Sequence, residues 1–162
     1  MKKILFLLVA ILATSLAAHS QMAAAKKVPR IISCSLQTEM SVQRAYAAVC
    51  DVNSYPKLSG GLITSVTNVG SSTDKITVTL NSGKKYDFTL TPNTNYNTLS
   101  FSLTSPKEYE NIGFIIIVDE AGDGTKLGIS ASGDVSPSVR DAAKNVMEPI
   151  FNALLQGFKS LE

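Results

Sequence analysis

The stretch from Ser136 to Leu161 constrains the fold more than any other, because it is long, helical in pattern and apolar on one side. Ser136 is a typical helix cap, and Pro137 is tolerated at the first helical position. Apolar residues then recur in steps of three and four, which places them on one helical face. They are Val139, Ala142, Ala143, Val146, Met147, Ile150, Phe151, Leu154, Leu155, Phe158 and Leu161. A helix of about 25 residues spans roughly 37 Å, so this face requires a large apolar partner surface. Pro149 is expected to bend the helix.

The first 20 residues have the pattern of a secretory signal peptide. A positively charged start precedes an apolar run over residues 4–13, and small residues stand at Ala18 and Ser20. The apolar run is shorter than the roughly 20 residues that span a bilayer. We therefore predict cleavage after Ser20, a periplasmic or secreted protein, and no stable membrane anchor after signal removal.

The remaining chain has the length of one domain. We predict a flexible lead-in over residues 21–29 and a single domain over residues 30–162. Of the 15 Lys and Arg residues, Lys2 and Lys3 belong to the signal, so 13 basic residues face 13 acidic ones and the mature net charge is near zero. No basic stripe is present, so nucleic acid is not an expected partner.

The only histidine, His19, lies inside the predicted signal peptide. The mature chain therefore lacks the general base of Ser-His-Asp and Cys-His catalysis and the commonest ligand of transition metals. We predict no catalytic residues, no metal site and no cofactor. Two cysteines remain, Cys34 and Cys50. In an oxidising compartment they form a possible disulfide, and the alternative is two small buried side chains.

Short alternating segments precede the long helix. The pattern predicts a strand over residues 31–37, a helix over Val42 to Cys50 that Ser41 caps, and a helical turn at residues 55–58. Six strands joined by hairpins follow, over residues 62–69, 75–80, 85–90, 98–104, 113–119 and 126–132, with a turn opening at Pro92-Asn93. Consecutive hairpins make an antiparallel sheet, and only the last helix is long enough to cover its apolar face.

The strand over residues 113–119 is apolar on both faces. Phe114, Ile116 and Val118 share one face, while Ile115 and Ile117 share the other. Because a strand that is apolar on both faces is usually covered on both, the second face is a candidate contact with a neighbour or dimer partner. The sequence leaves monomer and homodimer open.

Four stretches, taken in order, resemble the START and birch-pollen-allergen-like superfamily (SRPBCC), in its polyketide cyclase and lipid-transport branch. They are the capped helix start Ser41 to Tyr46, Asp51 followed by Tyr55-Pro56, the hairpin Asp123-Gly124-Thr125, and the terminal amphipathic helix. The resemblance implies an α+β helix-grip fold: a seven-stranded antiparallel sheet wrapped around the long C-terminal helix, with two short helices after strand 1. It also implies a cavity between sheet and helix for a small hydrophobic ligand such as a lipid, a sterol or a polyketide.

Inward-facing aromatic and long apolar side chains are the candidate lining of that cavity. They are Tyr46, Tyr86, Phe88, Phe101, Phe114, Met147, Phe151 and Leu154. Ordinary core packing is the alternative for each. As a set they predict an apolar pocket in which tyrosine hydroxyls orient a ligand.

A cyclase-like or dehydratase-like enzyme acting on a polyketide-type substrate is the competing hypothesis. Cyclase-like members of the superfamily use carboxylates, Tyr or Arg within the cavity, and the available groups here are Arg44, Asp51, Tyr46 and Tyr86. No pair of them has a spacing that demands acid–base work. Asp51 is also explained as the residue that ends the short helix. A third alternative is a non-catalytic dimeric interaction module.

The remaining acidic residues have simple interpretations. Asp119, Glu120 and Asp123 belong to one hairpin, and no calcium-loop spacing is present. Asp87 alternates with Tyr86 and Phe88, so it is expected on the solvent side of its strand.

Overall fold

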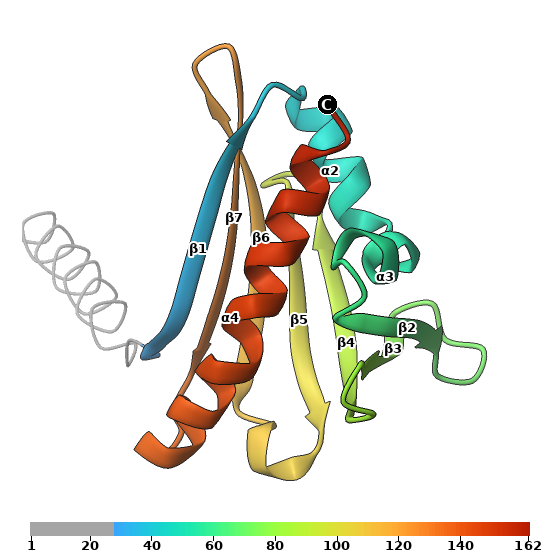
Figure 1. Ribbon diagram of the computed structural model, residues 1–162, viewed down its shortest axis with the longest axis vertical. Helices are drawn as coiled ribbons and strands as arrows, with labels where there is room; N and C mark the ends of the chain where they lie inside the picture. The colour runs from blue at the N-terminus through green and yellow to red at the C-terminus, as the bar shows by residue number, and fades with distance from the viewer. Residues whose placement is uncertain (1–27) are drawn as a thin grey trace, which may run out of the picture.

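The computed structural model describes residues 28–162 (Figure 1). The predicted signal peptide and most of the lead-in lie outside these residues. The elements follow one another as β1 (Arg30–Thr38), α2 (Val42–Cys50), η1 (Val52–Ser54), α3 (Tyr55–Leu58), β2 (Ile63–Asn68), β3 (Lys75–Leu80), β4 (Lys85–Asn93), β5 (Thr98–Ser105), η2 (Lys107–Tyr109), β6 (Ile112–Ala121), β7 (Gly124–Gly133) and α4 (Pro137–Lys159). None of the helices in the described range is long and apolar enough to cross a membrane.

All seven strands form one antiparallel sheet in the order β1-β7-β6-β5-β4-β3-β2. Strands β2 to β7 pair as consecutive hairpins, and β1 adds to β7 at the far edge. Figure 1 shows α4 crossing in front of the curved sheet, with α2 and α3 at the end of the sheet where the chain terminates. The predicted architecture is confirmed: a sheet wrapped around the long terminal helix, with two short helices after the first strand.

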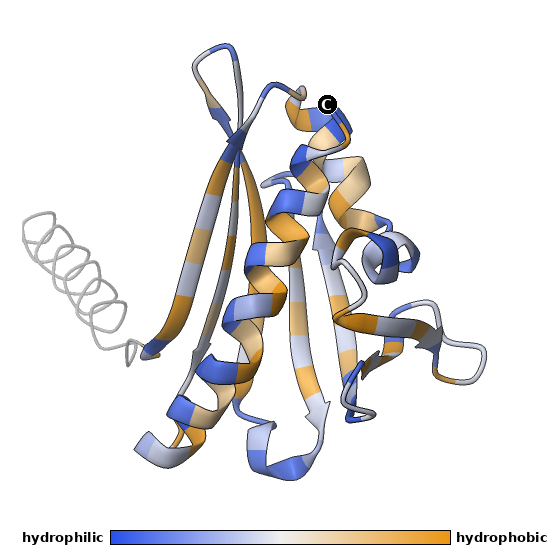
Figure 2. Ribbon diagram, in the orientation of Figure 1, coloured by the Kyte–Doolittle hydropathy of each residue, from blue (hydrophilic) through white to orange (hydrophobic). Residues whose placement is uncertain are grey.

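Helix α4 begins as its sequence predicts. Ser136 caps it, with its side-chain oxygen accepting a hydrogen bond from the backbone N–H of Val139 at 3.4 Å, and Pro137 takes the first position. One face is buried against the sheet, and Figure 2 shows hydrophobic residues along that side of the helix. The buried residues are Ala143, Met147, Phe151, Leu154, Leu155 and Phe158. Pro149 lies within the helix, which continues through it to Lys159.

The end of α4 packs directly on α3 at Gly157. A Cβ atom at this glycine would lie 2.2 Å from the backbone oxygen of Leu58 and 2.8 Å from its carbonyl carbon. Only a residue without a side chain permits this approach. The contact holds the end of α4 against the short helix that carries Tyr55.

The predicted turn at Pro92-Asn93 is wrong, because β4 continues through Pro92 to Asn93. The N–H of Leu90 bonds to Asp74, on the β3 side, and an N–H at position 92 would point the same way. Strand β3 begins at Lys75, which pairs with Thr89, so β4 has no partner strand on that side at Pro92. The missing donor of proline therefore costs no ladder bond. The turn falls at residues 94–97, where Asn97 has a φ of 46°.

Ile115 and Ile117 are half-buried. Strand alternation places them on the convex face of the sheet, opposite the face from which Phe114 and Ile116 line the cavity. Their register partners are small: Ser100 and Ser130 flank Ile115, and Thr98 and Gly128 flank Ile117. The described helices cover only the opposite face. Whether another copy of the chain covers this one stays a prediction.

The possible bridge between Cys34 and Cys50 is not formed in the structure, and both cysteines are free. Cys34 is half-buried on β1, close enough to Glu148 of α4 that burial and this negative charge together raise the pKa of its thiol. Cys50 is the exposed last residue of α2 and contacts the hydroxyl of Tyr46. The two thiols therefore belong to different packing contacts.

Candidate ligand-binding cavity

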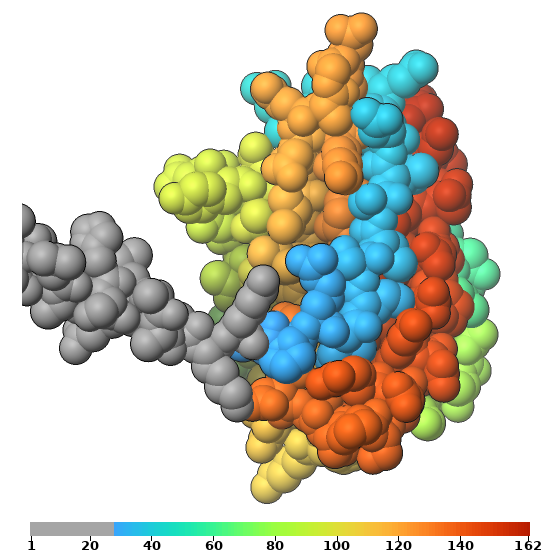
Figure 3. All heavy atoms as spheres, turned by 90° about the vertical axis from the view of Figure 1, so that its left-hand side faces the viewer, coloured from blue at the N-terminus to red at the C-terminus, as the bar shows by residue number. Residues whose placement is uncertain are grey.

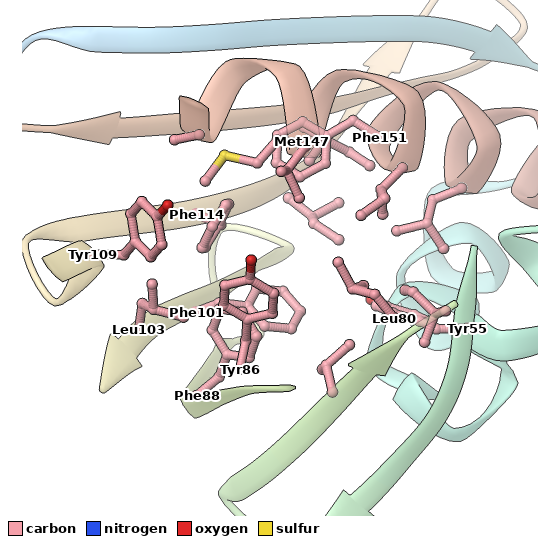
Figure 4. Close-up of a pocket in the computed structure, with 18 residues that line it drawn as sticks. Tyr55, Leu80, Tyr86, Phe88, Phe101, Leu103, Tyr109, Phe114, Met147 and Phe151 are labelled. Atoms are coloured by element: carbon pink, nitrogen blue, oxygen red, sulfur yellow. The ribbon is translucent and has the colours of Figure 1, made fainter. Parts of the chain in front are cut away.

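A cavity of about 110 Å³ lies between α4 and the inner face of the sheet (Figure 4). Side chains from every strand except β1, together with α3, η2 and α4, form its wall. The lining residues are Tyr55, Ile63, Val78, Leu80, Tyr86, Phe88, Phe101, Leu103, Tyr109, Phe114, Ile116, Ile129, Ala143, Val146, Met147, Ile150, Phe151 and Leu154. Apart from the three tyrosine hydroxyls, their side chains carry no hydrogen-bonding group stronger than a thioether.

Strand alternation and helical spacing explain why these side chains converge. Register pairing places Phe88 beside Leu103 and Phe101 beside Phe114, so that their side chains share the concave face of the sheet. From α4, residues at steps of three and four point back at the strands. The cavity wall therefore follows from the alternation of side chains along the strands and from the 3.6-residue period of α4.

Phenylalanine rings form a connected cluster along one wall. The Phe88 ring is edge-on to Phe101 and Phe114, with centroids 6.0 and 5.5 Å away, and Phe114 is edge-on to Phe151 at 5.8 Å. The edge-to-face geometry is a favourable one for aromatic pairs and adds to the hydrophobic gain of burial. The cluster ties β4, β5 and β6 to α4.

The cavity is not fully enclosed, and it opens to solvent on one side. The lining residues that remain half-buried rather than fully buried are Tyr86, Phe88, Tyr109, Phe114, Val146 and Ile150. They belong to β4, η2, β6 and the middle of α4, so the mouth lies between these elements. On the opposite side β1 lies directly against α4 (Figure 3).

The three tyrosine hydroxyls have different surroundings. The hydroxyl of Tyr55, at the inner end, donates a hydrogen bond of 2.6 Å to the carbonyl of Val49, and burial raises the pKa of this phenol well above its ordinary value. Tyr86 and Tyr109 stand together at the mouth, with ring centroids 6.3 Å apart. Figure 4 shows their hydroxyls directed toward the side of the cavity that α4 forms.

The surroundings of Tyr86 at the mouth keep its hydroxyl protonated. Burial, the neighbouring Tyr109 and the charge of Glu108 raise the pKa of Tyr86, so this hydroxyl is neutral at physiological pH. Among the described residues, no charged side chain lines the cavity itself. A group held there meets neutral hydroxyls and apolar surface.

All but one of the predicted lining residues lie on the cavity wall: Tyr86, Phe88, Phe101, Phe114, Met147, Phe151 and Leu154. Tyr46 does not. It points from α2 toward the β4–β5 turn, where its hydroxyl donates to the carbonyl of Thr98 at 3.4 Å. Tyr46 lies outside the cavity wall because α2, which carries it, packs over the ends of the strands.

Several lining residues were missed from sequence. Tyr109 lies in the polar loop after β5, and its only signal was a lone aromatic residue between two apolar strands. Val78 and Leu80 alternate on β3 in the same way as the predicted residues on β4, so their pattern was sufficient to find them. Tyr55 was hidden by its place in a helical turn.

The groups considered for catalysis do not converge. Arg44 reaches the carbonyl of Leu161 at the end of the chain, and Asp51 is the exposed residue at which α2 ends. Of the four candidate groups only Tyr86 lines the cavity. The structural interpretation of Asp51, as the end of the helix, matches its position.

The other acidic residues also lie away from the cavity. Asp119, Glu120 and Asp123 are exposed at the β6–β7 hairpin. Across residues 28–162 no cluster of three or more His, Cys, Asp or Glu side chains is arranged to hold a metal ion. Asp87 lies on the convex face, half-buried, and accepts a hydrogen bond of 2.6 Å from Thr77.

Comparison with solved structures places this architecture among known proteins. A START superfamily protein from Mycobacterium smegmatis superposes with a TM-score of 0.65 and 16% identity, over 83% of this chain and 100% of that one. The Zhui aromatase/cyclase from Streptomyces sp. R1128 superposes with a TM-score of 0.68 and 8% identity, over 83% of this chain and 93% of that one. The protein has the helix-grip fold.

Other helix-grip structures extend the comparison. Norcoclaurine synthase from Thalictrum flavum, in complex with dopamine and hydroxybenzaldehyde, matches with a TM-score of 0.65 and 14% identity, over 80% of this chain and 84% of that one. No family model and no curated protein matches the chain. The resemblance to the START and birch-pollen-allergen-like superfamily is thus confirmed at the level of the fold.

Proposed function

We propose that this protein is an exported carrier that binds a small hydrophobic ligand in the cavity beneath α4. One observation carries the proposal: a cavity of about 110 Å³ stays open inside the domain and is walled by apolar and aromatic side chains. Apolar cavities of comparable size stay dry, and a molecule that enters one removes its own apolar surface from water. Export rests on the signal pattern of residues 1–20 and is part of the proposal.

The similar structures support a ligand of this kind. They include an aromatase/cyclase and a synthase in complex with two single-ring compounds. An enzyme needs in addition a general acid or base at the ligand, and among residues 28–162 the only ionisable groups on the cavity wall are tyrosines. The carrier is therefore the function that this cavity supports best.

The test is whether an apolar probe enters this cavity. Adding toluene to the purified chain is expected to raise its melting temperature, because a ligand that binds only the folded state stabilises it. The variant Ala143→Phe places an additional ring into the cavity from α4, where Ala143 is 3% exposed. This variant is expected to lose the response to toluene.

Ala142→Phe is the matched control, because Ala142 is exposed on the same turn of α4. It adds the same ring on the solvent side and is expected to keep the full response to toluene. Native mass spectrometry of protein prepared from the export compartment then identifies any molecule that the wild type carries. If toluene stabilises neither the wild type nor the control, the proposal fails.

A further inference from the structure

The size of the cavity limits the ligand. Its volume of about 110 Å³ is somewhat below that of an engineered apolar cavity of about 150 Å³ that admits benzene. A molecule with one ring, or a short chain of similar bulk, fits this space with small side-chain adjustments. A four-ring sterol or a two-chain lipid requires α4 to move away from the sheet.

The mouth offers one place for a polar group. Tyr86 and Tyr109, from β4 and η2, stand 6.3 Å apart between ring centroids, and both hydroxyls face the cavity. Neither hydroxyl donates to another group in the described part of the chain. Each is therefore available both as a donor and as an acceptor. The third hydroxyl, that of Tyr55, already donates to Val49 and is not available in this way.

The surroundings of the mouth select against a negative charge. No Lys or Arg lines the cavity among the described residues. The negative charge of Glu108 lies close enough to the hydroxyl of Tyr86 to help raise its pKa. An ionised carboxylate at this position would lose its hydration without a cationic partner, which is costly. A hydroxyl or carbonyl group avoids this cost and is satisfied by the two tyrosines.

We propose that the ligand is a small uncharged molecule of about one ring in bulk that carries one hydroxyl or carbonyl group. This group lies between Tyr86 and Tyr109 at the mouth, and the apolar part packs against Phe88, Phe114 and Phe151. The inference rests on the proposed carrier function, because it concerns the occupant of the same cavity. It specifies size, polarity and orientation, which the carrier function alone does not.

Three probes of nearly equal size separate these properties. Toluene has no polar group, p-cresol adds one neutral hydroxyl, and p-toluate adds a carboxylate. Calorimetric titration of the full chain is expected to rank them p-cresol, then toluene, then p-toluate. A neutral hydrogen bond made in the complex favours p-cresol over toluene by roughly three- to tenfold. Cholesterol is the size control and is expected not to bind.

Two variants assign the effect to the tyrosines. In the double variant Tyr86→Phe with Tyr109→Phe, the cavity keeps its rings and loses both hydroxyls, so the preference for p-cresol over toluene is expected to disappear. Tyr96→Phe is the matched control, since Tyr96 is 73% exposed at the tip of the β4–β5 hairpin, away from the cavity. It is expected to keep the wild-type ranking.

The outcomes are distinguishable. Equal binding of toluene and p-cresol, or a preference for p-cresol that survives the double variant, overturns the assignment of the polar group and leaves the carrier function standing. Tightest binding of p-toluate overturns the neutrality of the ligand. Tight binding of cholesterol overturns its size. If no probe binds, the carrier function fails and this inference fails with it.

Discussion

Replacing Gly157 with alanine is expected to destabilise the protein, although the same change in an exposed helix is stabilising. Alanine is favoured over glycine in a helix interior by about 1 kcal/mol. At this site the added Cβ would lie 2.2 Å from the oxygen of Leu58 and 2.8 Å from its Cα, and these are backbone atoms that no rotamer change removes. A normal carbon–oxygen contact is about 3.3 Å, so α3 and α4 must separate by roughly 1 Å.

The magnitude follows from these opposing terms. Inserting a methyl group into a packed contact costs about 1–3 kcal/mol, and more where the neighbour is rigid. Because the clash involves backbone on both sides, we expect it to exceed the gain in helix propensity and to leave a net loss of about 1–2 kcal/mol. For a domain of this size the melting temperature then falls by roughly 4–8 °C. Toluene binding should weaken as well, because α3 carries Tyr55 at the inner end of the cavity.

Urea denaturation and thermal melting of the variant measure this loss. Gly128→Ala is the control, because no atom lies within 4 Å of a Cβ at Gly128 on the convex face of the sheet. It is expected to be neutral or slightly stabilising, since glycine weakens a strand. A Gly157→Ala protein that is as stable as the wild type would show that α3 and α4 can separate at this contact at no cost in stability.

Three further predictions test other parts of the structure. At pH 8 a maleimide should label Cys50 well before Cys34, because Cys50 is exposed while burial and Glu148 raise the pKa of Cys34; equal rates by peptide mass spectrometry would contradict this. Stability should fall as the pH rises through about 10, where tyrosines of the unfolded chain ionise and the buried Tyr55 stays protonated. In Tyr55→Phe the urea midpoint should depend less on pH in this range, and an unchanged dependence would refute the assignment. Light scattering should give the same monomer mass for the wild type and Ile115→Glu, since two half-buried isoleucines among small residues make a small patch; a mass that halves on substitution would identify a dimer.

Sequence periodicity predicted the fold well, because the strands and α4 bury one face each and their patterns are therefore regular. Steps of three and four in α4 correctly placed Met147 and Phe151 inside, and alternation in β4 correctly placed Tyr86 and Phe88. The same reasoning failed where local pattern does not decide geometry. Proline usually indicates a turn, and Pro92 fits within β4 only because β3 begins too late to pair with it. The sequence around Pro92 does not show where β3 begins.

The site was less predictable than the fold because part of its wall comes from short connecting segments. Tyr109 reaches the mouth from η2, and Tyr55 reaches the inner end from α3, and neither segment is long enough to show a period. For Tyr46 the helix was predicted correctly, but the residue does not line the cavity. The position of α2 relative to the cavity depends on long-range packing that the local pattern does not show. Gly157 likewise carried no sign of its close contact with Leu58.

The most direct test of the central claim is to locate a bound probe by methyl NMR. With toluene added, we expect chemical-shift changes at methyl groups of Leu80, Ile116 and Leu154, which line the cavity. Ile117 is the internal reference, because it neighbours Ile116 in sequence but lies on the convex face, and its methyl signals should not move. Shifts at Ile117 with none at the cavity methyls, or no shifts at all, would contradict the claim that open apolar space beneath α4 takes up a ligand.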